Sequence, residues 1–259
     1  MVSRQVRRRS GVVVSQSTKF AGPPRRNSRQ QAKRTMARRV RMGIQNYSAK
    51  KGPFPANKIV VFPFADNVST AGFTVGVPTP YIYQLNSLYD PNFTGTGTSV
   101  EWMDTLLGAE GTNAPYKTYQ VKEVGWKVSC CNLDANGTSS ARLCLTFTND
   151  VSSYPNTLEA AYMNPETICS DVMFPYSSGK GQVTLKGKIP ISRIIGNTYA
   201  KDVQSSALYN GNPSGVYGAY MICQIFPINE GSTSVLTYVL RPEFSMYTLL
   251  SNRNEQPTS

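Results

Sequence analysis

Residues 116–131 have the sequence YKTYQVKEVGWKVSCC, which carries the clearest structural pattern in the chain. Apolar residues recur at almost every second position: Tyr119, Val121, Val124, Trp126, Val128 and Cys130. A period of two is typical of a strand with one buried face, and a slip in that period indicates a β-bulge. The slip falls near Glu123, so we expect a long strand with a bulge at that position.

Similar apolar and β-branched runs recur on both sides of this stretch, separated by turn residues. They cover residues 58–64, 80–85, 141–147, 181–191, 216–228, 234–240 and 243–250. Pro63 is expected to break the first run, and Arg241-Pro242 to separate the last two, because proline cannot donate to a strand ladder. Asn136-Gly137 predicts a tight turn after the long strand.

These runs and the long strand make about eight strands, joined by long loops rather than by regular crossover helices. Short helices are expected at residues 101–107, 157–163 and 191–195. Such an order favours antiparallel sheets over a parallel α/β sheet. The sequence therefore predicts an all-β fold, a single antiparallel eight-stranded jelly-roll sandwich, over residues 52–259.

Charge divides the chain at residue 51. The first acidic residue is Asp66, and residues 1–51 hold fifteen of the 27 Lys and Arg. The rest of the chain contains the other twelve Lys and Arg and all fifteen Asp and Glu. The arm therefore has a net charge of +15 and the rest of the chain a net charge of −3. A cationic tail on a nearly neutral domain predicts a polyanion as partner.

The candidate nucleic-acid-binding residues are the fifteen cations of this arm. They are Arg4, Arg7, Arg8, Arg9, Lys19, Arg25, Arg26, Arg29, Lys33, Arg34, Arg38, Arg39, Arg41, Lys50 and Lys51. Eleven are arginines, whose planar guanidinium forks match phosphate oxygens and stack on bases, so the bias favours nucleic acid. Six of them also resemble a nuclear localisation signal: Arg25, Arg26, Lys33, Arg34, Arg38 and Arg39.

The arm has too few apolar residues to offset the entropy of ordering it, so residues 1–51 are expected to be largely disordered when free. An alternative for part of it is a short helix, because Ala32, Met36, Val40 and Ile44 recur every four residues. The residues Gly52-Pro53-Phe54-Pro55 form a stiff connector that ends the arm. No apolar run is long enough to span a bilayer, so membrane insertion is not expected.

Catalytic and metal-binding patterns are missing. The chain has no histidine, which removes Ser-His-Asp and Cys-His schemes. Its five cysteines, Cys130, Cys131, Cys144, Cys169 and Cys223, form no C-x-x-C pair and are expected to be reduced thiols, with Cys130, Cys144 and Cys223 buried. We therefore expect no enzyme activity, no metal and no cofactor.

Three partial motifs fall short of their full patterns. Residues 211–215 (GNPSG) have the wrong spacing for a nucleophile elbow, and residues 179–181 (GKG) lack the rest of a phosphate loop. Glu101 and Asp104, three residues apart, are typical of the solvated side of a helix.

One stretch is similar to a known group of proteins. Residues 86–97, NSLYDPNFTGTG, are followed by YKTYQV at residues 116–121. Together with the Arg-rich N-terminus, they resemble capsid proteins of Rep-encoding circular single-stranded DNA viruses, the group that includes circoviruses. The sequence departs from the group's usual pattern after Gly97.

This resemblance implies a viral capsid protein that self-assembles as a homo-oligomer of about sixty copies in a small icosahedral (T=1) shell. It implies arms that package a single-stranded circular DNA genome, assembly in the host nucleus with nuclear import receptors as partners, and residence in the virion. Two alternatives stay open on the residues alone: a coat protein of a small RNA virus, and a cellular nucleic-acid-binding structural protein with a basic tail.

Overall fold

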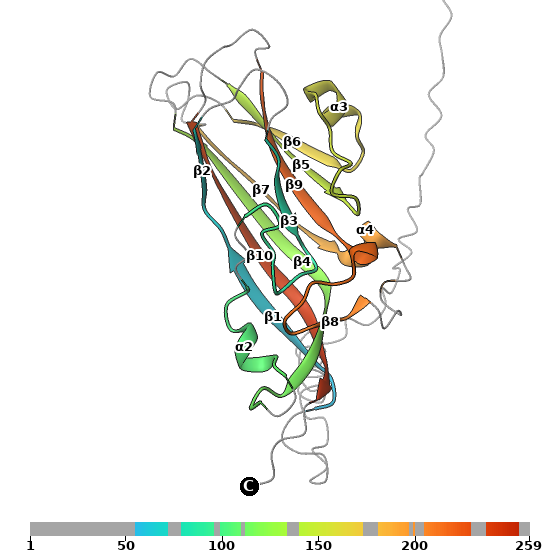
Figure 1. Ribbon diagram of the computed structural model, residues 1–259. Coiled ribbons are helices and arrows are strands. Elements are labelled where there is room, and N and C mark those ends of the chain that lie inside the picture. The colour runs from blue at the N-terminus through green and yellow to red at the C-terminus, as the bar shows by residue number, and fades with distance from the viewer. Residues whose placement is uncertain are drawn as a thin grey trace, which may run out of the picture. The chain divides into compact units, whose positions relative to one another are not determined.

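The long strand expected at residues 116–131 is β4 (Tyr116–Asn132) of the computed structural model (Figure 1). The structure describes residues 55–71, 79–95, 99–109, 112–133, 140–172, 181–196, 199, 205–228 and 237–253. The expected bulge is confirmed. Tyr247 pairs with Glu123 but the next residue, Thr248, pairs with Val121, so Lys122 is the extra residue on β4.

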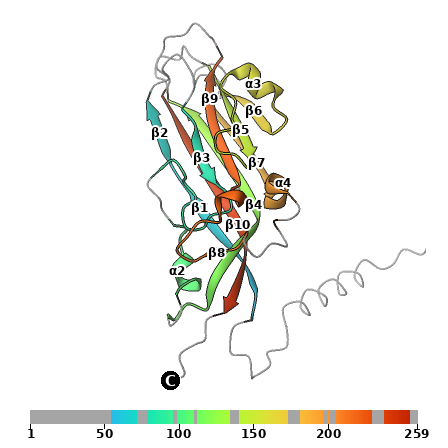
Figure 2. The ribbon, with the colours of Figure 1, turned by 45° about the vertical axis from the view of Figure 1, so that its right-hand side comes forward.

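Two antiparallel sheets build the body. The larger has the order β1 (Lys58–Ala65), β10 (Thr237–Arg253), β4 and β7 (Gln182–Pro190), with β2 (Val68–Ala71) beside β10 and β8 (Ala207–Leu208) beside β4. The smaller has the order β3 (Tyr81–Gln84), β9 (Tyr220–Pro227), β5 (Ala141–Thr148) and β6 (Thr167–Val172). Figures 1 and 2 show the two sheets running together along the body.

The strand pairs are nested. With β2 and β8 set aside, the eight described strands pair first with last (β1 with β10), second with seventh (β3 with β9), third with sixth (β4 with β7) and fourth with fifth (β5 with β6). A chain paired in this way and rolled into two sheets is a double-sheet jelly roll. The predicted fold class is confirmed.

Short helices lie at the three expected positions. They are α2 (Met103–Leu106), α3 (Leu158–Met163) and α4 (Ile191–Ile195), and a 3-10 turn, η3 (Gly215–Tyr217), precedes β9. The Thr157 side chain caps α3 by accepting a hydrogen bond from the Ala160 backbone N–H. The predicted turn at residues 136–137 lies outside the described residues.

The predicted strand breaks at Pro63 and at Arg241-Pro242 were wrong. β1 continues through Pro63, which lies in the edge strand of its sheet, where proline is tolerated. β10 continues through Pro242, so the two expected C-terminal strands are one. Pro242 lies beside the short segment that joins β1 to β2. Its carbonyl accepts a hydrogen bond of 3.0 Å from the Asp66 backbone N–H. Pro242 therefore lacks its N–H at a position where β10 has no continuous strand beside it on that side.

The sequence pattern also missed β6. This edge strand has the sequence TICSDV, in which apolar residues do not alternate regularly and five of the six are at least partly exposed. It pairs along its length with β5, from Ala141 opposite Val172 to Thr146 opposite Thr167. The prediction of about eight strands matches the eight main strands only because a split β10 offset the missing β6, and the short strands β2 and β8 were missed as well.

Aromatic contacts between the sheets fill the core. The Trp126 ring of β4 lies 5.2 Å from the Phe147 ring of β5, centroid to centroid. The Tyr83 ring of β3 lies 5.5 Å from the Phe244 ring of β10, edge to face. Aromatic pairs in such geometry each contribute about 0.5–1.5 kcal/mol beyond the area that they bury.

Gly187 makes room for Trp126, so Gly187→Ala is expected to destabilise the body. A Cβ at this position would lie 2.7 Å from Cζ2 of Trp126, which cannot move freely because it packs on Phe147. Overpacking costs about 1–3 kcal/mol, and we expect the melting temperature to fall by a few degrees. Gly215→Ala is the control, since nothing lies within 4 Å of its Cβ position. Equal melting temperatures for both variants would contradict the packing described.

Candidate functional sites

The fifteen candidate nucleic-acid-binding residues, including the six of the nuclear localisation signal, all lie within residues 4–51 and therefore outside the described residues. The alternative helix at residues 32–44 lies there as well. These assignments stay predictions. The described chain begins at Pro55, whose carbonyl accepts a hydrogen bond of 3.0 Å from the Tyr116 hydroxyl of β4.

The segment that carries the capsid resemblance holds the sandwich together. Asn86 is fully buried, its Nδ2 donates to the Tyr217 carbonyl at 2.5 Å, and its Oδ1 accepts from the Ala219 N–H at 3.2 Å. Two residues on, the Leu88 N–H donates to the Tyr119 hydroxyl at 3.2 Å. This segment therefore links η3 and the start of β9 to the first residues of β4.

A second group of hydrogen bonds lies at the other end of that segment. The Tyr83 hydroxyl and Asn92 Nδ2 both donate to Oδ2 of Asp66, at 3.1 and 2.9 Å. Burial raises the pKa of Tyr83, so its hydroxyl keeps the proton that it donates. Oδ1 of Asp90 is buried without a hydrogen-bond partner among the described residues, and burial raises the pKa of this carboxyl group.

No catalytic or metal constellation is found among the described residues. No group of three or more His, Cys, Asp and Glu side chains is close enough to hold a metal ion there. Ser214 is exposed and directly precedes η3, and Glu101 and Asp104 are both exposed. In the same ranges of the chain, no helix has the length and apolar character needed to cross a membrane.

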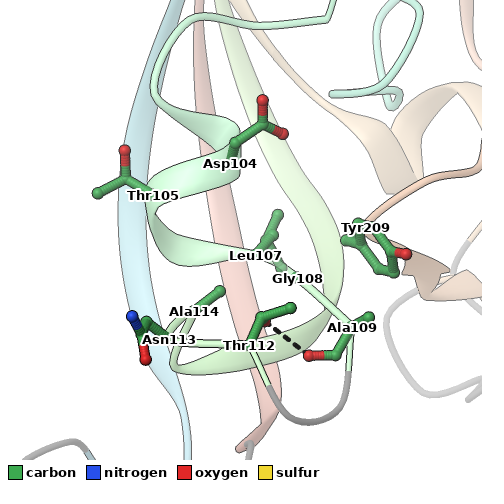
Figure 3. Close-up of a pocket in the computed structure, with 9 residues that line it drawn as sticks. All are labelled: Asp104, Thr105, Leu107, Gly108, Ala109, Thr112, Asn113, Ala114 and Tyr209. Carbon is green, nitrogen blue, oxygen red and sulfur yellow. Dashed lines mark hydrogen bonds between the residues drawn. The ribbon is translucent and has the colours of Figure 1, made fainter.

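A cavity of about 430 Å³ lies between α2, the chain that follows it and Tyr209 (Figure 3). Its walls are mostly small or apolar groups, and the Thr112 hydroxyl donates to the Ala109 carbonyl at 2.7 Å within its rim. Asp104 is the one carboxylate among the lining residues. The other polar groups of the lining are the hydroxyls of Thr105, Thr112 and Tyr209 and the Asn113 amide.

The cysteine prediction is confirmed as far as burial is concerned. Cys130, Cys144 and Cys223 are buried, and Cys131 and Cys169 are partly buried. Burial raises the pKa of Cys130 to about 12 and also raises the pKa of Cys144 and Cys223. A thiol with such a pKa is a poor nucleophile at neutral pH.

The outward side of the larger sheet carries a group of cations that the sequence analysis did not single out. Trp126 and Val128 point into the core, so Lys127 between them points outward, directly opposite Lys186 of β7. Two positions along β7, Lys188 crosses over Gly125 to the Tyr247 ring of β10, with Nζ 4.6 Å from the ring centroid. The alternation of residues 184–188 could have indicated this face.

We call this surface the lysine face and define it by its outward side chains on β1, β4, β7 and β10. They are Ile59, Val61, Glu123, Lys127, Lys186, Lys188, Arg241, Glu243, Tyr247 and Leu249. Ile59 is 69% exposed, although it is apolar. Lys127 pairs with Glu243 at 2.8 Å and Lys188 with Glu123 at 3.3 Å. Lys186 has no ion-pair partner among the described residues.

The opposite side of the sandwich carries an acidic surface. Ala161 of α3 packs on Cys144 and Phe226, which point outward from the smaller sheet. The exposed side of α3 and the loop after it then present Glu159, Tyr162, Met163 and Glu166, which we call the α3 face. Residues 149–172 contain four acidic residues and no Lys or Arg.

Comparisons with known proteins complete this description. No protein-family model and no curated protein matches the sequence. Among solved structures, the chain is similar to Desmodium yellow mottle tymovirus, with 10% identity, complete coverage of both chains and a TM-score of 0.38.

Two further similar structures are viral. A virus-like particle of the nodavirus of the prawn Macrobrachium rosenbergii has 9% identity, covers 79% of this chain and 100% of its own, and has a TM-score of 0.44. The 60-mer BFDV capsid protein has 12% identity, covers 80% of this chain and 100% of its own, and has a TM-score of 0.41. All three TM-scores are below 0.5.

Proposed function

We propose that this chain is a viral capsid protein whose jelly-roll body forms a closed shell and whose basic arm binds the genome inside. The observation that carries the proposal is the separation of charge: +15 on residues 1–51 and −3 on the remaining 208 residues. A nearly neutral body lets many copies pack side by side without strong repulsion, while the arms supply the charge for a polyanion.

Packaging in this scheme is electrostatic. Each arm neutralises phosphates and releases counterions without reading base sequence. About sixty arms in one symmetric shell would carry about 900 positive charges. Arms confined together act at a high effective concentration, so weak individual contacts give strong retention of the genome.

The finer parts of the proposal rest on the resemblance of residues 86–97 and 116–121 to capsid proteins of circular single-stranded DNA viruses. On that basis the genome is single-stranded circular DNA, the shell has about sixty copies, and assembly takes place in the host nucleus after import through the arm. Asn86 and Leu88 support the resemblance only as structural residues of the sandwich, because their contacts are internal.

Binding of the full chain to a single-stranded oligonucleotide is expected to weaken steeply with salt. The logarithm of the affinity falls by about 0.7 per contacted phosphate for each tenfold rise in salt, so six to ten contacts cost roughly 300-fold to 15,000-fold in affinity between 50 and 200 mM. Changing Arg25, Arg26, Lys33 and Arg34 together to Gln should reduce the slope by about 3.

Fluorescence anisotropy titrations at several salt concentrations measure this slope. The matched control changes the four cations of the lysine face, Lys127, Lys186, Lys188 and Arg241, to Gln, which should leave the slope unchanged. Binding that does not respond to salt, or a slope that falls equally in both variants, would overturn the assignment of the arm.

A further inference from the structure

The lysine face and the α3 face lie on opposite sides of the sandwich. The first is the outward side of the larger sheet, and the second covers the outward side of the smaller sheet, where Ala161 packs on Cys144 and Phe226. Figures 1 and 2 both show α3 beside β5 and β6 of the smaller sheet. β1, which carries part of the lysine face, is an edge strand of the larger sheet. One molecule therefore cannot bring these two faces together, but two copies can.

The charges of the two faces are complementary. The lysine face has four cations, Lys127, Lys186, Lys188 and Arg241, against two anions, Glu123 and Glu243, which gives a net charge of +2. The α3 face has Glu159 and Glu166 and no cation of its own. Arg142, which lies beneath the Tyr162 ring with Cζ 4.6 Å from its centroid, is already paired with Asp171.

The apolar parts of the two faces are complementary as well. On the lysine face, Ile59 lies opposite Leu249 and Val61 opposite Tyr247, which makes an exposed apolar corner on β1 and β10. On the α3 face, Met163 is 82% exposed. An exposed methionine with Glu159 and Glu166 on either side of it in sequence fits an apolar corner that Lys188 borders at the Tyr247 ring, and exposed apolar groups of this kind indicate protein contacts.

The same charges disfavour symmetric pairing. Two lysine faces in contact would bring the Lys186 side chains of the two copies together, and two α3 faces would oppose Glu159 and Glu166. Like charges across an interface cost several kcal/mol, so unlike faces are preferred. A contact between unlike faces is heterologous, and it builds a ring when the rotation between successive copies closes.

We propose that the α3 face of one copy docks on the lysine face of the next, with Met163 against the apolar corner and Glu159 and Glu166 against Lys186. The contact is a lateral joint of the shell, and in that sense it rests on the proposed capsid function. Nucleic acid is a poorer occupant of the lysine face, because Glu123 and Glu243 already neutralise two of its lysines at 3.3 and 2.8 Å and would repel phosphates.

A charge exchange in the full chain tests this contact. Lys186→Glu alone, and Glu159→Lys with Glu166→Lys, should each raise the protein concentration required for assembly by about tenfold or more. The triple variant restores opposite charges and should assemble at a concentration close to that of the unchanged protein. Met163→Asp should also weaken assembly, because it removes the apolar side chain that contacts the corner. Arg193→Glu, which changes the charge by the same amount as Lys186→Glu but lies outside both faces, is the control.

Sedimentation velocity over a concentration series measures assembly, and melting curves show that each variant is folded. Normal assembly of both charge variants, or failure of the triple variant to recover when it is folded, would overturn the proposed contact while leaving the capsid function intact. Normal assembly with less bound nucleic acid in Lys186→Glu would also overturn it and assign the lysine face to the genome. If the unchanged protein forms no particles, the proposed function itself fails, and the contact fails with it.

Discussion

Deletion of residues 1–51 is expected to abolish nucleic-acid retention while leaving the jelly roll folded. All fifteen arm cations are lost, and the remaining chain has a net charge of −3, so it has no excess of positive charge to hold a polyanion. The described strands begin at Lys58, after the deleted segment, and their pairing partners all lie within residues 58–253.

Two measurements on the same preparation separate binding from folding. The ratio of absorbance at 260 and 280 nm should fall to that of protein alone, and the affinity for a single-stranded oligonucleotide should drop by several orders of magnitude at low salt. Circular dichroism and the melting temperature should stay close to those of the full chain. A truncated protein that is folded and still retains nucleic acid would show that the body, not the arm, is the binding site.

Replacement of Asn86 by Ala is expected to cause a large loss of stability. The side chain satisfies two backbone groups in a fully buried position, the Tyr217 carbonyl and the Ala219 N–H. Each buried polar group left without a partner costs about 1–3 kcal/mol, so the loss of two partners should lower the free energy of unfolding by about 2–6 kcal/mol. The effect should extend to assembly, because Ala219 directly precedes β9, which lies between β3 and β5.

Urea denaturation followed by tryptophan fluorescence measures this change as a shift of the midpoint. Asn113→Ala is the matched control, since Asn113 is exposed and its loss should change stability by no more than about 0.5 kcal/mol. Equal midpoints for the two variants would show that Asn86 does not hold η3 and β9 in place.

Much of this fold follows from local patterns. The alternation in residues 116–131 predicted β4 and its bulge, because a buried core on one side imposes a period of two on a strand. The proline errors have a common cause: whether Pro63 or Pro242 interrupts a strand depends on what lies beside it. Pro63 is in an edge strand, and Pro242 faces the gap between β1 and β2. That information is tertiary and is absent from the local sequence.

The candidate sites divide in the same way. The arm was predicted from composition alone, because a run of cations without acids can be recognised without knowledge of the fold. The lysine face required the strand pairing, since Lys127 and Lys186 are 59 positions apart in sequence and become neighbours only through the pairing of β4 with β7. The role of Asn86 likewise depends on contacts with residues 217 and 219, which lie far from it in the chain.

Negative-stain electron microscopy of the purified full chain, with nuclease treatment of the nucleic acid extracted from it, tests the central claim most directly. We expect closed shells of uniform size whose cargo is degraded by DNase and resists RNase. Shells with RNase-sensitive cargo would retain the capsid function and contradict the DNA genome. Monomers or dimers without cargo, at concentrations where the folded protein is stable, would contradict the capsid function.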